Sequence, residues 1–313
     1  MRLCYPNTML FLRKHFAVLL LCLLGFSPCA AQGADPSMKE PSVPTLRIGL
    51  PPERNIFSQI ERYEPLMRYV GKKAGVKFEL KVLPGYSEIV RDFEDMRLDG
   101  AFFGSFTYVI AHAQMGHMVI ARPESLAGVS AYQGILVVRK GSPIRSAKDM
   151  KGKRMAIASE ATTAGCLLSK VYFLENGIHE PKKFLKELYI AGTHEAAFRD
   201  VIEGRADIGC AKNTVFDRIV AEDPRVNAGM VRVLAVTPEA PENGLALRPG
   251  VDRKLALKIK GALLSMERDP EGAAILKDFG ARRFIETSDG EYDKVREYAK
   301  KAQIAPGHMD CRK

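Results

Sequence analysis

The sequence predicts an α/β protein of two lobes, each a mainly parallel sheet flanked by helices, with two crossings of the chain as a hinge. Short apolar runs alternate with amphipathic runs of helical period, which is typical of parallel βα units. A turn signal at 140–143, Lys-Gly-Ser-Pro, interrupts the alternation, which then begins again. Late apolar runs at 231–236 and 245–248 indicate a return to the first lobe. Crossings near Val137 and Val236 would let the lobes close on a cleft.

The first lobe is expected to open with a βα repeat. Strands are assigned where apolar residues alternate or run unbroken, and helices where they recur every three or four positions. In chain order the elements are strand 46–50, helix 56–74, strand 77–82, helix 86–96, strand 100–103, helix 107–115 and strand 118–122. A long apolar strand over 133–139 then leads into the turn signal.

The second lobe repeats this pattern. Its expected elements are helix 146–150, strand 154–158, helix 166–176, strand 188–191, helix 194–203, strand 206–210 and helix 214–221. Strand 231–236 is expected to lead back, and strand 245–248 with helices 254–267, 270–279 and 292–302 completes the first lobe. We place the first lobe at 45–137 plus 237–302 and the second at 138–236, followed by a loose tail over 303–313.

The N-terminus has the three parts of a secretory signal peptide. Positive residues precede an apolar run at 16–26, which is followed by small residues. That run is shorter than the roughly 20 residues needed to span a bilayer, so we expect export to the periplasm rather than a membrane helix. We assign 1–31 to the signal and 32–44 to a disordered, Pro-rich leader. Cys29 follows Phe-Ser-Pro, a poor lipoprotein motif, so lipid anchoring is the weaker alternative.

The composition limits the kinds of ligand, partner and cofactor that we expect. The net charge of +10 favours an anionic ligand, and the basic residues alternate with acidic ones, so no nucleic-acid partner is expected. Of the six cysteines only Cys166, Cys210 and Cys311 follow the signal region. We expect the first two to be buried free thiols, with a bridge between them as the alternative. The histidine spacing predicts no metal site, and the chain lacks nucleotide-binding glycine motifs, so no cofactor is expected.

Polar residues follow three of the expected strands where each strand gives way to a helix. The clearest case is Thr162-Thr163-Ala164-Gly165, and Ser105 with Thr107 and His194 stand at two similar junctions. Loops at the carboxyl ends of neighbouring strands converge on the ligand crevice of such a sheet. Helix starts and hydroxyl groups suit an anion, so we predict one shared oxyanion pocket. Capping of the helix is the structural alternative for the two threonines.

The ordered motifs resemble one known family, the phosphate, phosphite and phosphonate substrate-binding proteins of bacterial ABC importers. The resemblance covers nearly all of the folded part. It depends on 86–90 (YSEIV), 98–104 (LDGAFFG), 132–142 (YQGILVVRKGS), 162–165 (TTAG), 192–197 (GTHEAA), 204–209 (GRADIG) and 245–250 (LALRPG).

The resemblance implies a type II periplasmic binding protein whose lobes close on a tetrahedral oxyanion. The family loop that matches 162–165 holds the oxyanion with hydroxyls and helix-terminal amides. The family residues that match His194, Tyr86 and Tyr132 complete the grip. Ser105 and Thr107 are weaker candidates, because the family often has Gly-Pro where this chain has Gly-Ser.

The chain departs from the family pattern at three further candidate positions. Ala164 replaces a hydroxyl residue of the family loop and retains a backbone amide. Members that select aminoalkyl phosphonates have carboxylates where this chain has Thr214 and Asn243. We therefore predict a ligand without a cationic amine, such as phosphate, phosphite or a simple phosphonate. His194 is expected to make its binding depend on pH between roughly 5 and 8.

The sequence thus predicts a monomeric, non-catalytic solute receptor that delivers its anion to a membrane ABC permease. One alternative keeps the fold but signals to a membrane sensor kinase. An enzyme that acts on a phosphorus ester is the other alternative, and we find no acid or base for it apart from His194.

Overall fold

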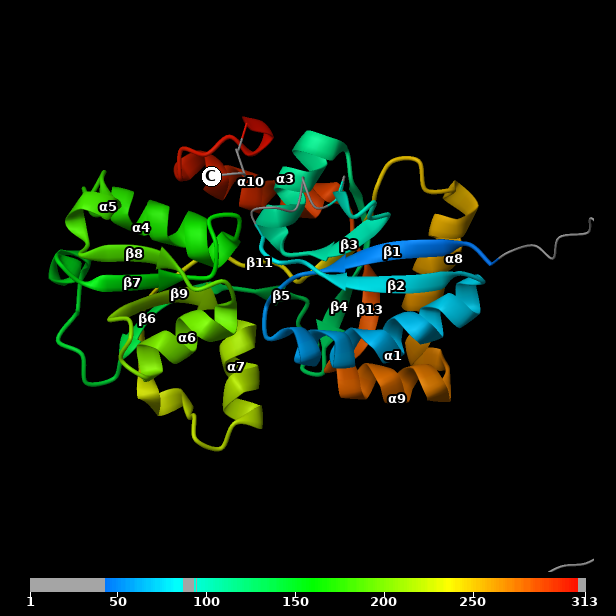
Figure 1. Ribbon diagram of the computed structural model, residues 1–313, viewed down its shortest axis with the longest axis horizontal. Helices are drawn as coiled ribbons and strands as arrows, with labels where there is room; N and C mark the ends of the chain where they lie inside the picture. Colours follow the sequence, from blue (N-terminus) through cyan, green and yellow to red (C-terminus); the bar gives the residue numbers. More distant parts are fainter. Residues whose placement is uncertain (1–42, 87–92, 94, 309–313) are drawn as a thin grey trace, which may run out of the picture. The chain divides into compact units, whose positions relative to one another are not determined.

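The computed structural model describes residues 43–86, 93 and 95–308 (Figure 1). The signal-peptide and leader assignments fall outside this part, as does most of the helix expected at 86–96. Within the described residues, every helix is too short or too polar to cross a membrane.

The larger sheet has six strands in the order β13-β4-β12-β3-β1-β2 (Figure 1). β1 is parallel to β2 and β3, whereas β12 is antiparallel to β3 and β4, and β13 is antiparallel to β4. The sheet is therefore mixed, and its parallel part is the βα repeat that the sequence indicated. The strands are β1 Thr45–Leu50, β2 Lys77–Val82, β3 Gly100–Phe103, β4 Met118–Ser125, β12 Gly244–Leu247 and β13 Ala281–Glu286.

Both faces of this sheet are covered by helices. On β3, Phe102 packs with Ile48 against α1, α8 and α9, whereas Phe103 packs against α3 and α10 on the other face. Successive strand residues point to opposite faces of the sheet, so a short, continuously apolar strand contributes side chains to the hydrophobic core on each face. The helices are α1 Ile56–Ala74, α3 Ser105–Met115, α8 Arg253–Leu264, α9 Pro270–Phe279 and α10 Asp293–Lys301.

The smaller sheet has five strands in the order β10-β6-β9-β7-β8. Ile135 and Val137 of β6 face one core and Leu136 and Val138 the other, so this sheet too is covered on both faces. Figure 1 shows α4 and α5 on one side and α6 and α7 on the other. The elements are β6 Gly134–Arg139, β7 Arg154–Ile157, β8 Glu187–Ile190, β9 Ile208–Lys212, β10 Val231–Val236, α4 Ser169–Glu175, α5 Pro181–Phe184, α6 His194–Ile202 and α7 Asn213–Glu222.

The chain passes between the two sheets twice, at 126–133 and 237–243. The two segments pair as a short antiparallel ladder of β5 (Ala131–Tyr132) and β11 (Ala240–Pro241). We had placed the first crossing near Val137, but β6 lies wholly within the smaller sheet. The late strand β10 also stays in that sheet, paired with β6, and β12 is the strand that returns to the larger one.

The sequence pattern did not predict every element correctly. β13 was missed because only Ala281 and Phe284 are fully buried in this edge strand, and arginines occupy exposed positions between them. β9 runs two residues further than the expected 206–210. The segment after α10 was expected to be loose, yet Ile304 packs on the core and the Pro306 carbonyl accepts a hydrogen bond from Gln114 of α3.

Candidate functional site

A small pocket of about 10 Å³ lies where the strand ends of both sheets meet the crossing segments. A cavity of this size accommodates about one water molecule. The pocket is lined by residues that the sequence predicted together with residues that it did not. The lining comprises Glu53, Tyr86, Gly104, Thr107, Tyr132, Thr162, Thr163, His194, Lys212 and Asn243. The shared-pocket prediction thus has a counterpart in the structure.

Two helix starts face each other at this pocket. α3 of the larger sheet begins at Ser105, and a helix of the smaller sheet begins at Thr163 as a π-helical turn and continues into α4. The Phe106 amide donates a hydrogen bond to Thr163 Oγ1 at 3.2 Å, and Thr107 Oγ1 donates to the Ala161 carbonyl at 3.0 Å. Both helix dipoles present their positive ends here, which favours an anion between them.

The two threonines have different roles. Thr162 is the N-cap of its helix: its Oγ1 accepts from the Gly165 amide at 3.0 Å and donates to the Ser159 carbonyl at 2.9 Å. Its oxygen therefore caps the helix, which was the structural alternative, and its hydroxyl proton is engaged by the Ser159 carbonyl. Thr163 Oγ1 accepts from Phe106 and from the Tyr132 hydroxyl, at 2.9 Å for the latter, which leaves its own proton free to donate.

Tyr86 presents an open hydrogen-bonding group. Its side chain is 3% exposed, and its hydroxyl has no hydrogen-bond partner among the described residues. Burial raises the pKa of Tyr86 well above its ordinary value, so the phenol stays protonated. Buried polar groups in native proteins are nearly always paired, so an unpaired phenol in a pocket marks a place for a polar ligand.

His194 is the first residue of α6, and its ring lies 5.6 Å from that of Tyr86, between centroids. Its Nδ1 accepts a hydrogen bond from the Lys212 amide at 3.3 Å, which leaves Nε2–H as a donor. Burial lowers the pKa of His194 to about 4, although Glu53 partly opposes this effect. The ring is therefore neutral between pH 5 and 8 in this structure, which argues against the expected pH dependence from its titration in that range.

Four predicted residues do not line the pocket. The Ser105 hydroxyl donates to the Pro241 carbonyl at 2.5 Å, and the Ala164 backbone packs against Gly134. Gly165 fills a tight position, where a Cβ would lie 2.6 Å from the Ser159 carbonyl. Thr214 lines a neighbouring cavity of about 400 Å³ at the start of α7. Asn243 does line the pocket, where it contacts charged groups.

The sequence analysis missed a buried charged cluster at the same pocket. Lys212 Nζ donates to Glu53 Oε1 at 2.9 Å, to Asn243 Oδ1 at 3.2 Å and to Glu242 Oε1. Lys212 is 2% exposed and Glu53 4% exposed. The sequence analysis found no acid or base apart from His194, so it missed these two carboxylates and the ammonium.

These charges stabilise one another. Burial disfavours the charged form of Glu53, but Lys212 and then Arg62 outweigh this and hold the pKa of Glu53 well below its usual range. Burial alone would lower the pKa of Lys212, whereas Glu242 and Glu53 raise it above its ordinary value. Glu53 and Lys212 therefore both remain ionised at neutral pH, and the three protons of the ammonium are all engaged.

The strand-end rule could have found two members of this cluster. Glu53 follows β1 and Lys212 ends β9, so each stands at the carboxyl end of a buried strand. The sequence analysis considers only hydroxyl residues and His194 at strand ends, and its strand 206–210 ends before Lys212. Glu242 gave no such signal, because it follows the unpredicted two-residue strand β11.

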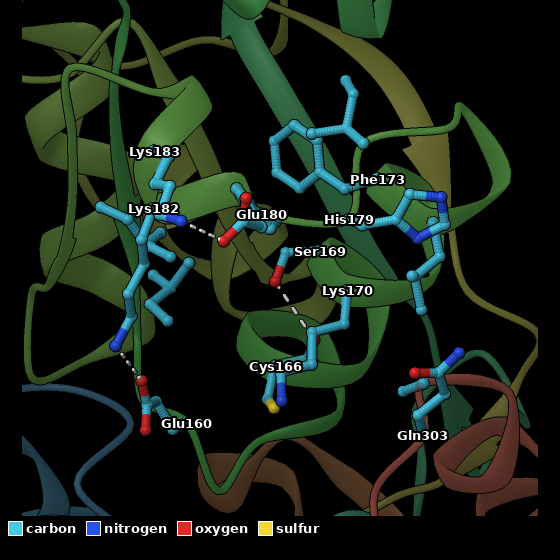
Figure 2. Close-up of a pocket in the computed structure, with 16 residues that line it drawn as sticks. Glu160, Cys166, Ser169, Lys170, Phe173, His179, Glu180, Lys182, Lys183 and Gln303 are labelled. Carbon is cyan, nitrogen blue, oxygen red and sulfur yellow. Dashed lines mark hydrogen bonds and ion pairs between the residues drawn. The ribbon is translucent and has the colours of Figure 1, made fainter.

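A larger cavity of about 420 Å³ lies elsewhere, beside α4 and α5 (Figure 2). Lys182 pairs there with Glu160 at 3.7 Å, and Lys183 with Glu180 at 2.5 Å, as the dashed lines show. Both lysine side chains are 77% exposed, so these pairs are solvated surface contacts. Cys166, which lines this cavity, and Cys210 are both buried free thiols. No cluster of metal-ligating side chains occurs among the described residues.

The fold defines the class, a two-lobed binding protein of the periplasmic type, and a small pocket lies between its sheets. A solved binding protein of an ABC phosphonate transporter from Pseudomonas aeruginosa superposes with a TM-score of 0.76 at 19% identity, covering 83% of this chain and 87% of that one. PhnD1 from Prochlorococcus marinus (MIT 9301), solved in complex with methylphosphonate, gives a TM-score of 0.72 at 21% identity, with 83% and 99% covered.

The chain belongs to the family described as ABC transporter, phosphonate, periplasmic substrate-binding protein, whose model matches residues 48–292. A curated relative, the probable ABC transporter phosphite binding protein PhnD1 of Prochlorococcus marinus (strain MIT 9301), is 24% identical over 282 residues. The alignment covers 86% of this chain and 92% of the relative. Members of this family are substrate-binding proteins of transporters, so the role suggested by the motif order is the role of the family.

Proposed function

We propose that this protein captures a small phosphorus oxyanion between its two lobes in the periplasm and delivers it, as a monomer, to a membrane ABC permease. The observation that carries the proposal is the pair of helix starts at Ser105 and Thr163, which present positive dipole ends to one pocket. The names of the relatives, which refer to phosphite and phosphonates, support the same ligand class. Each lobe is one sheet with its helices, and β5 and β11 form the hinge.

Neutral donors would bind the anion. Tyr86 offers an unpaired phenol, Thr163 a free hydroxyl proton and His194 its Nε2–H. A phosphorus oxyanion is larger than a pocket of about 10 Å³, so the lobes must separate to admit it. Separation breaks the bond between Phe106 and Thr163, and both groups then become available to the anion. A ligand that binds both lobes favours the closed state by its differential affinity.

The preferred ligand carries no amine. Two carboxylates lie at the pocket, but two cations already balance them: Lys212 contacts both, and Arg62 lies 3.9 Å from Glu53. An added ammonium would therefore meet a site of balanced charge. Phosphate, phosphite and methylphosphonate fit this requirement, and aminoalkyl phosphonates do not.

Calorimetry on the mature protein tests the proposal, with phosphate, phosphite, methylphosphonate and sulfate as titrants. We expect at least one phosphorus anion to bind with a Kd in the micromolar range or below, and Thr163→Val to weaken it by about tenfold, the equivalent of one hydrogen bond. Ser146→Ala serves as the control, because Ser146 caps an exposed helical turn. Binding of sulfate alone, or of no anion, would contradict the proposal.

A further inference from the structure

The ammonium of Lys212 lies in a cage that suits a free alkylammonium ion. Carboxylate oxygens of Glu53 and Glu242 and the amide oxygen of Asn243 accept its three hydrogen bonds. The Tyr132 ring adds its face, with Nζ 4.5 Å from the ring centroid. Charged acceptors together with an aromatic face are the elements that proteins use to recognise ammonium groups.

The cage and its occupant come from different parts of the fold. Lys212 ends β9 of the smaller sheet, whereas Glu53 follows β1 of the larger sheet. Glu242 and Asn243 lie between the crossing strand β11 and β12. The bond between Lys212 and Glu53 therefore joins residues 159 positions apart.

The acceptors of the cage are held in place without the lysine. Asn243 Nδ2 donates to Glu53 Oε1 at 2.9 Å, and the Asn243 amide donates to Glu242 Oε1 at 3.3 Å. Arg62 Nη1 lies 3.9 Å from the other carboxylate oxygen of Glu53, so Oε2 faces a second cation while Oε1 faces Lys212. Removal of the lysine side chain would leave two carboxylates with one fewer cation and an unfilled space.

The cage adjoins the anion-binding groups. Lys212, Tyr132 and Thr163 line the same small pocket. A ligand with an anionic head beside Thr163 and an amine on a short chain would therefore place its amine where Nζ lies. The tethered ammonium occupies that position first and at high effective concentration.

We propose that Lys212 is a specificity-determining residue: its side chain occupies an ammonium subsite built by Glu53, Glu242, Asn243 and Tyr132, and so excludes ligands that carry a primary amine. This statement deepens the proposed function, because it takes the neighbouring groups to bind an anion. The existence of the subsite itself can be tested without any anion.

The first experiment uses Lys212→Ala, which removes the three outer methylenes and the ammonium. Propylammonium chloride supplies the same atoms in free form. We expect it to raise the Tm of this variant by about 3 °C or more relative to sodium chloride of equal ionic strength. Propan-1-ol, which lacks the charge, and tetramethylammonium, which lacks N–H donors, should have no such effect.

Three controls define the response. Wild type keeps its own ammonium, and Lys212→Met fills the space with an uncharged chain, so neither should respond to propylammonium. Lys140→Ala removes an exposed lysine and should also be silent. If Lys212→Ala does not fold alone, refolding is carried out with propylammonium or propan-1-ol. Recovery with propylammonium only supports the subsite, and failure with both overturns it.

The second experiment compares ethylphosphonate with 2-aminoethylphosphonate by calorimetry. Wild type should bind ethylphosphonate at least tenfold more tightly, and Lys212→Ala should shift the ratio of the two affinities by at least tenfold towards the amine. Equal binding of the two by wild type overturns the specificity role. If no phosphorus anion binds but propylammonium still stabilises Lys212→Ala, the proposed function fails and the ammonium subsite stands. If phosphonates bind and propylammonium has no effect, the subsite fails alone.

Discussion

The two sides of the pocket differ in how their polar groups are satisfied. On one side, Thr163, Tyr86 and His194 offer neutral donors, and at least one of them has no partner among the described residues. On the other side, the Lys212 ammonium donates to two carboxylates and to the Asn243 amide oxygen, so its hydrogen bonds are all made within the protein. The comparison teaches that the neutral side still has free hydrogen-bond donors for a ligand. On the ionic side, the hydrogen-bonding groups of Lys212 and Glu53 are already used to link the two sheets.

The largest expected effect is on the ionic side. Glu53→Gln removes a carboxylate charge from a buried pair, which leaves Lys212 undercompensated, so we expect a loss of about 3 kcal/mol in the free energy of unfolding. Urea denaturation at pH 7 measures this loss. Glu64→Gln is the matched control, because Glu64 pairs with Arg68 on the surface and should change stability by less than about 1 kcal/mol. Equal losses in the two variants would contradict the structural role of the buried cluster.

The next effect concerns His194 and pH. Its pKa is about 4 in the folded protein, below the ordinary 6.5, so protonation favours the unfolded chain. The stability contributed by the neutral ring is complete above pH 6.5 and is lost as pH falls from there towards 4. We expect wild type to lose about 2 kcal/mol more than His194→Gln between pH 7 and pH 4.5.

Urea denaturation of both proteins at several pH values measures this difference. His117 also has a pKa lowered to about 4, mainly by burial, and it contributes equally to both proteins. The difference between them therefore isolates His194. Parallel stability curves over this range would show that His194 does not resist protonation.

The smallest effect distinguishes two unpaired phenols. Tyr86→Phe removes a buried hydroxyl without a partner, so we expect stability unchanged or raised by up to about 1 kcal/mol, together with about fivefold weaker binding of methylphosphonate. Tyr292→Phe is the matched control, since its hydroxyl is also buried and unpaired among the described residues, but its ring packs on Tyr108 and does not line the pocket. Unchanged affinity in Tyr86→Phe would show that Tyr86 does not contact the ligand.

Much of the fold could be predicted because its strands are local apolar patterns. The unbroken run Ile135–Val138 is apolar at every position, and the structure buries it on both faces. The edge strand β13 could not be predicted, because solvent reaches most of its side chains and its pattern is dominated by arginine. The pairing of β10 with β6 could not be predicted from the local sequence either, because strand order depends on which edge of the sheet is free to pair.

The pocket shows the same division. The order of the motifs and the polar strand ends were sufficient to predict that Thr163, Tyr132 and His194 lie together, and the structure brings them to one pocket. The sequence could not show that the Thr162 hydroxyl caps the helix, whereas the Thr163 hydroxyl has a proton free to donate. That distinction depends on which backbone groups each side chain meets.

The sequence by itself determined the α/β class, the two sets of βα units and the anion-friendly start of the helix at Thr163. Only the tertiary structure decided the electrostatics of the pocket, because charge pairing depends on which strand ends converge. Lys212 meets Glu53 and Glu242 across large separations in the chain, and no local pattern records such a meeting. The partner charges then keep Glu53 and Lys212 ionised against the effect of burial: at the surface, water would solvate these charges, whereas in the pocket each requires a partner.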